Sequence, residues 1–164
     1  MNAAVAEPTG WTQVFLTPGG VYCTARPTII TTILGSCISV CLWDRVQRVG
    51  GMNHFVLPVA GAHNSGGRYG DVSLEDLISQ MVELGGRTGA ILAKVFGGAT
   101  VLPISGSAET VGERNLEMAL TTLKRHRVAV AAHRTGGENG KLIKFNTWSG
   151  EVAVRHFDST TASV

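Results

Sequence analysis

Long apolar runs are absent from this 164-residue chain, and no stretch approaches the roughly 20 consecutive apolar residues that a membrane-spanning helix needs. The first ten residues also lack the basic and apolar regions of a secretory signal peptide. Charged residues are scarce at 16%, and the formal net charge of +2 is too small to indicate a nucleic-acid-binding surface. We therefore expect a cytoplasmic protein that neither enters a membrane nor binds nucleic acid.

Cysteine is also sparse, with only Cys23, Cys37 and Cys41, and an odd number of thiols is typical of a reducing compartment. A metal site formed by these thiols and His54 is one alternative. However, the spacing of Cys37 and Cys41 lacks the short CxxC knuckle, and no second pair completes a tetrahedron. We expect neither a metal nor another cofactor, and we interpret Cys23 and Cys41 as structural residues.

The composition that remains, 44% hydrophobic with 21 glycines, is typical of a globular fold with many turns. We expect one domain over residues 11–158, with flexible ends at residues 1–10 and 159–164.

Apolar residues recur with helical spacing over residues 72–84 and 108–124, and each segment predicts a helix. For the first helix we expect an N-cap at Asp71 or Ser73 and an end at Gly85-Gly86. Strands are expected over residues 14–16, 29–34, 38–43, 51–57, 90–96, 128–133, 141–146 and 151–156. Gly136-Gly137 is expected to form a hairpin turn. The predicted fold class is α+β, a layered α/β sandwich with a largely antiparallel or mixed sheet core and two main helices.

A thiol and an imidazole are brought together by the predicted hairpin over residues 38–57. If Trp43 pairs with Arg48 around a four-residue loop, Cys37 faces His54 across the two strands. Directly opposed side chains project from the same face of a sheet, close enough for a hydrogen bond between sulfur and imidazole. The pair is the minimum machinery of thiol nucleophilic catalysis, although a cysteine is also commonly a buried small hydrophobic residue.

The residues around Cys37 fit a catalytic interpretation. Gly35 allows a tight turn before the cysteine, and the backbone N–H groups around Ser36 and Cys37 could line an oxyanion hole. Gly35, Ser36 and Asn53 are therefore the residues expected to shape the site. Arg114 and Asn115, near the start of the second helix, are either a solvated charge and a cap or part of the site's rim.

The strings LGSCISVCLWD and GGMNHFVLP resemble the chemoreceptor glutamine deamidases of the CheD family. The resemblance continues through Arg68-Tyr69-Gly70-Asp71, Lys94 to Ala99, Val111-Gly112-Glu113-Arg114-Asn115 and Thr135-Gly136-Gly137, and so spans roughly residues 12 to 157. It departs from the usual family pattern at His133-Arg134, which puts partner contacts in doubt and leaves the chemistry intact.

This resemblance implies hydrolysis of selected glutamine side chains on the cytoplasmic helices of methyl-accepting chemotaxis receptors, with Cys37 as nucleophile and His54 as base. The family's third catalytic residue is an upstream threonine. Thr31 is preferred because it shares the parity of Cys37 in a continuous strand, and Thr32 is the alternative. A second interpretation is a regulatory module that docks a CheC-type chemotaxis phosphatase, with deamidation secondary or absent.

Overall fold

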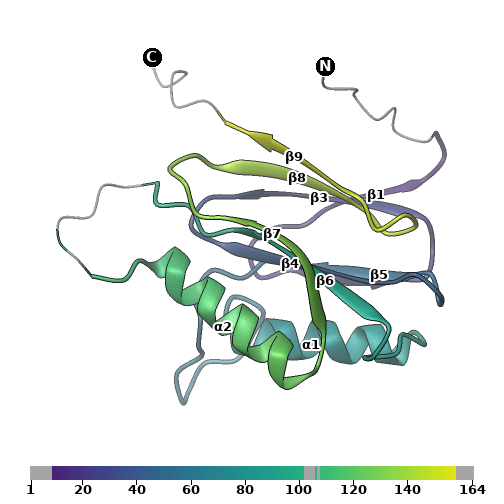
Figure 1. The fold of residues 1–164 in the computed structure, drawn as a ribbon, viewed down its shortest axis with the longest axis horizontal. Helices are drawn as coiled ribbons and strands as arrows, with labels where there is room; N and C mark the ends of the chain where they lie inside the picture. The colour runs from purple at the N-terminus through teal and green to yellow at the C-terminus, as the bar shows by residue number, and fades with distance from the viewer. Residues whose placement is uncertain (1–8, 102–105, 107, 158–164) are drawn as a thin grey trace.

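The computed structural model describes residues 9–101, 106 and 108–157, which form three layers (Figure 1). One layer is a four-stranded sheet with strand order β1-β3-β8-β9, and the middle layer is a five-stranded sheet with order β2-β5-β4-β6-β7. Helices α1 and α2 cover the outer side of the five-stranded sheet. The strands are β1 (Thr12–Phe15), β2 (Val21–Thr24), β3 (Thr28–Leu34), β4 (Ile38–Asp44), β5 (Val49–Asn53), β6 (Ile91–Gly97), β7 (Ala129–Thr135), β8 (Lys141–Asn146) and β9 (Val152–His156), and the helices are α1 (Gly70–Glu83) and α2 (Val111–Arg125).

The predicted α+β sandwich with mixed sheets and two helices is confirmed. Every predicted strand is present within a few residues, and β2 is the strand that the sequence pattern missed. It has only four residues, too few for a clear alternation of apolar and polar side chains. The expected flexible ends fall largely outside the described residues and stay a prediction.

The start of α1 differs from the prediction, because its N-cap is Tyr69 and no side chain caps it. The Asp71 carboxylate instead accepts hydrogen bonds from the backbone N–H groups of Ala60 and Val72. The predicted helix end is confirmed, since the N–H groups of Gly85 and Gly86 donate to the last carbonyls of the helix.

The turn at Gly136-Gly137 is not the predicted hairpin, because β7 and β8 belong to different sheets. Both glycines have positive φ, 77° and 79°, which side chains other than glycine rarely adopt. The two residues therefore lead the chain from one sheet to the other.

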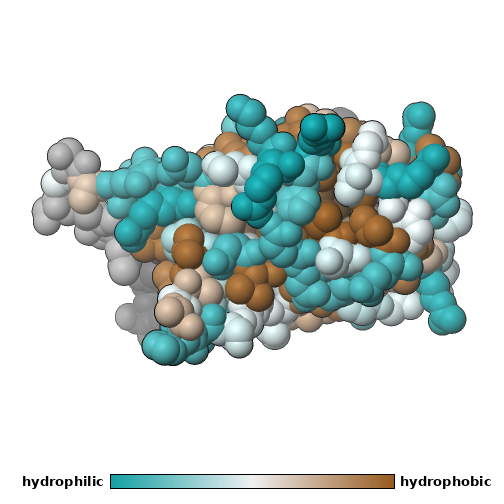
Figure 2. Space-filling model, turned by 90° about the horizontal axis from the view of Figure 1, so that it is seen from below, coloured by the Kyte–Doolittle hydropathy of each residue, from teal (hydrophilic) through white to brown (hydrophobic). Residues whose placement is uncertain are grey.

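Two buried clusters hold the layers together. One lies between the helices and the five-stranded sheet and includes Leu74, Leu77 and Leu123. The other lies between the two sheets and includes Ile30, Met52 and Phe145. Figure 2 shows the outer face of the helix layer, where hydrophilic residues surround smaller hydrophobic patches. Within the described residues, no helix is long and apolar enough to cross a membrane.

The chain also passes between the two sheets at residues 35–37, since β3 belongs to the four-stranded sheet and β4 to the five-stranded sheet. Cys37 is the last residue of this crossing. The crossing therefore places the candidate nucleophile at the edge of the core between the sheets, against which Cys37 packs.

Candidate active site

The crossing segment that carries Cys37 is fixed by hydrogen bonds from outside itself. The Gly35 carbonyl accepts from the N–H of Ala99 and the Cys37 carbonyl from the N–H of Gly98, each at 2.9 Å. Within the described residues, the N–H of Ser36 donates to no backbone carbonyl or side chain, and the N–H of Cys37 interacts only with its own thiol. Neither N–H is bound to another residue, so both could serve as the oxyanion donors that the sequence predicts.

Glycines let the supporting backbone approach this segment closely. A Cβ on Gly97 would lie 2.1 Å from the Cys37 carbonyl oxygen, and Gly97 has a positive φ of 107°. A Cβ on Gly112, in the first turn of α2, would lie 2.5 Å from the Gly98 carbonyl oxygen. Larger residues at these positions would displace the segment. The motifs at 94–99 and 111–115 therefore pack closely behind the segment that carries Cys37 and fix its position.

Cys37 and His54 both face the core between the sheets, although their register differs from the prediction. Asp44 pairs with Val49, so the loop lies one residue further along and the pairing shifts by two residues. The cause is Asp44, whose carboxylate accepts from two backbone N–H groups in the turn. A shift of two keeps every side chain on its face, since the side-chain period of a strand is two.

The shifted register makes Cys37 and His54 diagonal neighbours on either side of the bridge between Ile38 and Phe55. Diagonal neighbours on one face are roughly 7–8 Å apart at the backbone, within reach of long side chains. The predicted hydrogen bond is not formed, because within the described residues the His54 Nε2 atom has no partner. In a free enzyme such catalytic hydrogen bonds often tighten only when substrate binds.

The hydrogen-bond partner of His54 Nδ1 is Thr32 and not Thr31. The Thr32 Oγ1 atom lies 2.8 Å from His54 Nδ1 and donates its own hydrogen to the Leu16 carbonyl at 2.6 Å. Thr31, the residue preferred in the sequence analysis, is half-buried on the opposite face of β3. Thr31 does not share a face with Cys37, because the two residues do not lie in one continuous strand: the chain leaves β3 after Leu34 to cross between sheets.

The bond to Leu16 settles which nitrogen of His54 carries the proton. A hydroxyl has one hydrogen, and Thr32 gives it to a carbonyl that can only accept. Thr32 Oγ1 must therefore accept from His54 Nδ1–H. The neutral imidazole then keeps a free lone pair on Nε2, as a base that removes a thiol proton requires.

Burial lowers the pKa of His54 from 6.5 to about 4, and a hydrogen bond with the Leu16 backbone opposes this only in part. His54 is only 2% exposed. Burial also raises the pKa of the half-buried Cys37 thiol, while its own backbone N–H and the Arg68 guanidinium lower it. Both directions favour an uncharged thiol and imidazole in the resting site over an ion pair.

Arg68 is a component of the site that the pairing argument missed. Its carbonyl accepts from the N–H groups of Val56 and Leu57, just after His54. A Cβ on Gly19 would lie 3.1 Å from the Arg68 Cγ atom, so the stem of this exposed side chain crosses the turn that precedes β2. The only sequence signal for Arg68 was its place in the family motif.

Asn53 supports the shape of the site from inside the sheet. Its Oδ1 atom accepts from the Val40 N–H at 2.8 Å, and its carbonyl accepts from the Ser39 hydroxyl. Both contacts secure the pairing of β4 with β5 immediately before His54. Because adjacent residues of a strand point to opposite faces, Asn53 faces away from the side that His54 occupies.

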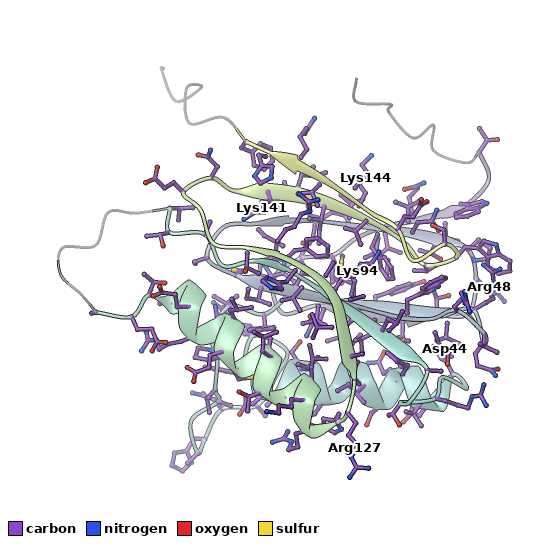
Figure 3. All side chains as sticks on the ribbon, in the orientation of Figure 1. Asp44, Arg48, Lys94, Arg127, Lys141 and Lys144 are labelled. Carbon is purple, nitrogen blue, oxygen red and sulfur yellow. The ribbon has the colours of Figure 1, made fainter. Side chains whose placement is uncertain are left out.

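The other thiols lie away from this chemistry. Burial raises the pKa of Cys23 to about 12, and also raises that of the fully buried Cys41. Among the described residues, no group of three or more His, Cys, Asp or Glu side chains could hold a metal ion. Lys94, labelled in Figure 3, reaches across between the sheets and donates to the Gly150 carbonyl at 2.7 Å.

A half-exposed thiol and a buried neutral imidazole that is oriented by a hydroxyl form the arrangement of a thiol-dependent hydrolase. Residues 56–156, more than half of the chain, match the family model described as "CheD chemotactic sensory transduction". The chain belongs to the CheD family.

Several relatives are described as "probable chemoreceptor glutamine deamidase CheD". The protein from Rhodospirillum rubrum is 51% identical over 88% of this chain and 82% of its own length. The protein from Trichlorobacter lovleyi is 45% identical over 85% of this chain and 88% of its own length. The matched family segment begins after His54, but an alignment over 88% of a 164-residue chain necessarily includes positions 37 and 54.

Proposed function

We propose that this protein is a chemoreceptor glutamine deamidase, which hydrolyses the side-chain carboxamide of glutamine residues on receptor helices to the carboxylate. The observation that carries the proposal is the chain of contacts from the Leu16 carbonyl through Thr32 to His54, which leaves Nε2 free on the side of the core where Cys37 packs. Relatives at 45–51% identity carry the same description.

The first half of the reaction forms a thioester. His54 Nε2 removes the thiol proton as Cys37 Sγ attacks the carboxamide carbon, and the carbonyl π electrons move to oxygen. The free N–H groups of Ser36 and Cys37 stabilise the developing oxyanion. The imidazolium returns its proton to the nitrogen, the C–N bond breaks and ammonia leaves. Thr32 holds the ring in line throughout.

The second half restores the enzyme. The oxygen of a water molecule attacks the thioester carbon while His54 Nε2 takes a proton from this water. The proton then returns to Cys37 as the C–S bond breaks. The product is a glutamate side chain, which carries one more negative charge than the substrate at neutral pH. On a receptor helix this charge alters repulsion between neighbouring carboxylates and so biases a signalling equilibrium.

The test is mass spectrometry of a receptor cytoplasmic domain incubated with the protein and with its Cys37→Ala variant. The wild-type protein should convert defined glutamines to glutamates and release ammonia, and Cys37→Ala should convert none. Cys41→Ala, which removes a buried thiol four residues away, is the matched control and should stay active. Conversion that persists in Cys37→Ala, or none with the wild type on any receptor, would refute the proposal.

The proposed substrate implies that the protein acts in the cytoplasm, where the receptor helices lie. Docking of a CheC-type phosphatase stays a prediction, and no described feature favours it over catalysis. It would gain support if Cys37→Ala retained full regulation of receptor signalling.

A further inference from the structure

One buried amide, that of Asn115, joins the two segments that carry Cys37 and His54. Its side chain comes from α2 and is fully buried. The Nδ2 atom donates to the Ser36 carbonyl at 3.2 Å and to the Val56 carbonyl at 2.9 Å. Ser36 directly precedes the nucleophile, and Val56 lies two residues beyond the base. The amide therefore spans both sides of the site.

The two acceptors fix the orientation of this amide, because a reversed amide would set Oδ1 against two carbonyl oxygens. In the observed orientation Oδ1 is buried and finds no donor among the described residues. A buried acceptor without a donor costs stability. Stabilisation of the helix alone is thus a poor explanation for an asparagine at position 115, and the two donated hydrogens are its distinguishing feature.

The first turn of α2 is held in place by contacts that also fix the position of this amide. Thr110 and Glu113 form a reciprocal capping box that defines the first turn of the helix. Gly112 packs backbone to backbone against Gly98, whose N–H holds the Cys37 carbonyl. Asn115, three residues further along, is therefore anchored to the same support as the nucleophile.

We infer that Asn115 is a positioning residue for the deamidase reaction. By holding the Ser36 and Val56 carbonyls together, it aims the N–H groups of Ser36 and Cys37 at the carboxamide oxygen where negative charge develops. Fixed donors stabilise such charge, and a misplacement of about 1 Å can lower the rate roughly 100-fold. The inference rests on the proposed deamidase function.

The experiment compares wild type, Asn115→Ala and Glu117→Ala, which alters an exposed residue of the same helix. Asn115→Ala should lower kcat for receptor deamidation roughly 10- to 100-fold and change KM less than about threefold, and Glu117→Ala should change kcat less than about twofold. Alkylation of Cys37 by iodoacetamide develops no oxyanion, so its rate in Asn115→Ala should stay within about threefold of wild type.

Cys41 reports on the fold in the same samples, because it is fully buried and reacts only if the structure opens. A positioning role leaves Cys41 unreactive, whereas a structural role exposes it. An unchanged kcat, a loss confined to KM, or a reactive Cys41 in both Asn115→Ala and the milder Asn115→Ser would overturn the inference. Failure of the wild type to deamidate any receptor would instead refute the proposed function.

Discussion

Acidification should destabilise this protein through His54. The folded protein holds the pKa of this side chain at about 4, below its ordinary value of 6.5. Between these values the unfolded chain binds a proton that the folded protein does not, so stability is complete above pH 6.5 and falls as the pH drops towards 4. Each pH unit in that window removes about 1.4 kcal/mol, which amounts to about 3 kcal/mol in all.

That loss is a large part of the roughly 5–15 kcal/mol that stabilises a typical domain. The assay is urea unfolding at several pH values across the window, for the wild type and for His54→Gln. The variant has no titrating group at this position, so the difference between the two pH slopes isolates His54. The other titrating groups contribute equally to both proteins. One of them is Glu75, and its hydrogen bonds with His126 and Arg125 lower the pKa of its carboxyl group. Identical slopes would refute the argument.

Three further perturbations test the site. Thr32→Val should lower kcat roughly 10- to 100-fold, whereas Thr31→Val should leave it within about twofold; equal losses would contradict the assignment of Thr32. Arg68→Gln should move the pH midpoint for alkylation of the nucleophile upward, and high salt should shrink the difference; an unmoved midpoint would argue against a charge effect. Gly97→Ala should reduce the free energy of unfolding, measured by thermal or urea unfolding, by about 1–3 kcal/mol. The control is Gly89→Ala, where no atom lies within 4 Å of the added Cβ, and it should reduce this free energy by less than about 0.5 kcal/mol. Similar losses in the two variants would exclude crowding as the cause.

The elements of the fold could be predicted because their patterns are local. The apolar run along 38–43 and the apolar stripe of the first helix are visible in short windows of sequence. Which sheet each strand joins could not be predicted in this way. The parallel pairs β1·β3 and β6·β7 join segments separated by other elements, and the crossings at 35–37 and 136–137 look like ordinary turns.

In the candidate site, too, the local features could be predicted and those that depend on tertiary structure could not. Cys37 and His54 were predicted to share a face, and they do, because the two-residue error in register preserves parity. Thr32 replaced Thr31 because the strand breaks before the nucleophile, which no parity rule along one strand can anticipate. The lowered pKa of His54 and the fully buried position of Asn115 depend on tertiary burial, which the sequence around each residue does not reveal.

The hydroxyl that orients the base comes from β3 in one sheet, and the base itself directly follows β5 in the other. In the proposed mechanism, turnover is therefore sensitive to how closely the two sheets of the sandwich are stacked, even where neither sheet loses a strand. A ligand or partner that wedged the sheets apart by a fraction of an ångström would silence the protein while its circular dichroism spectrum stayed the same.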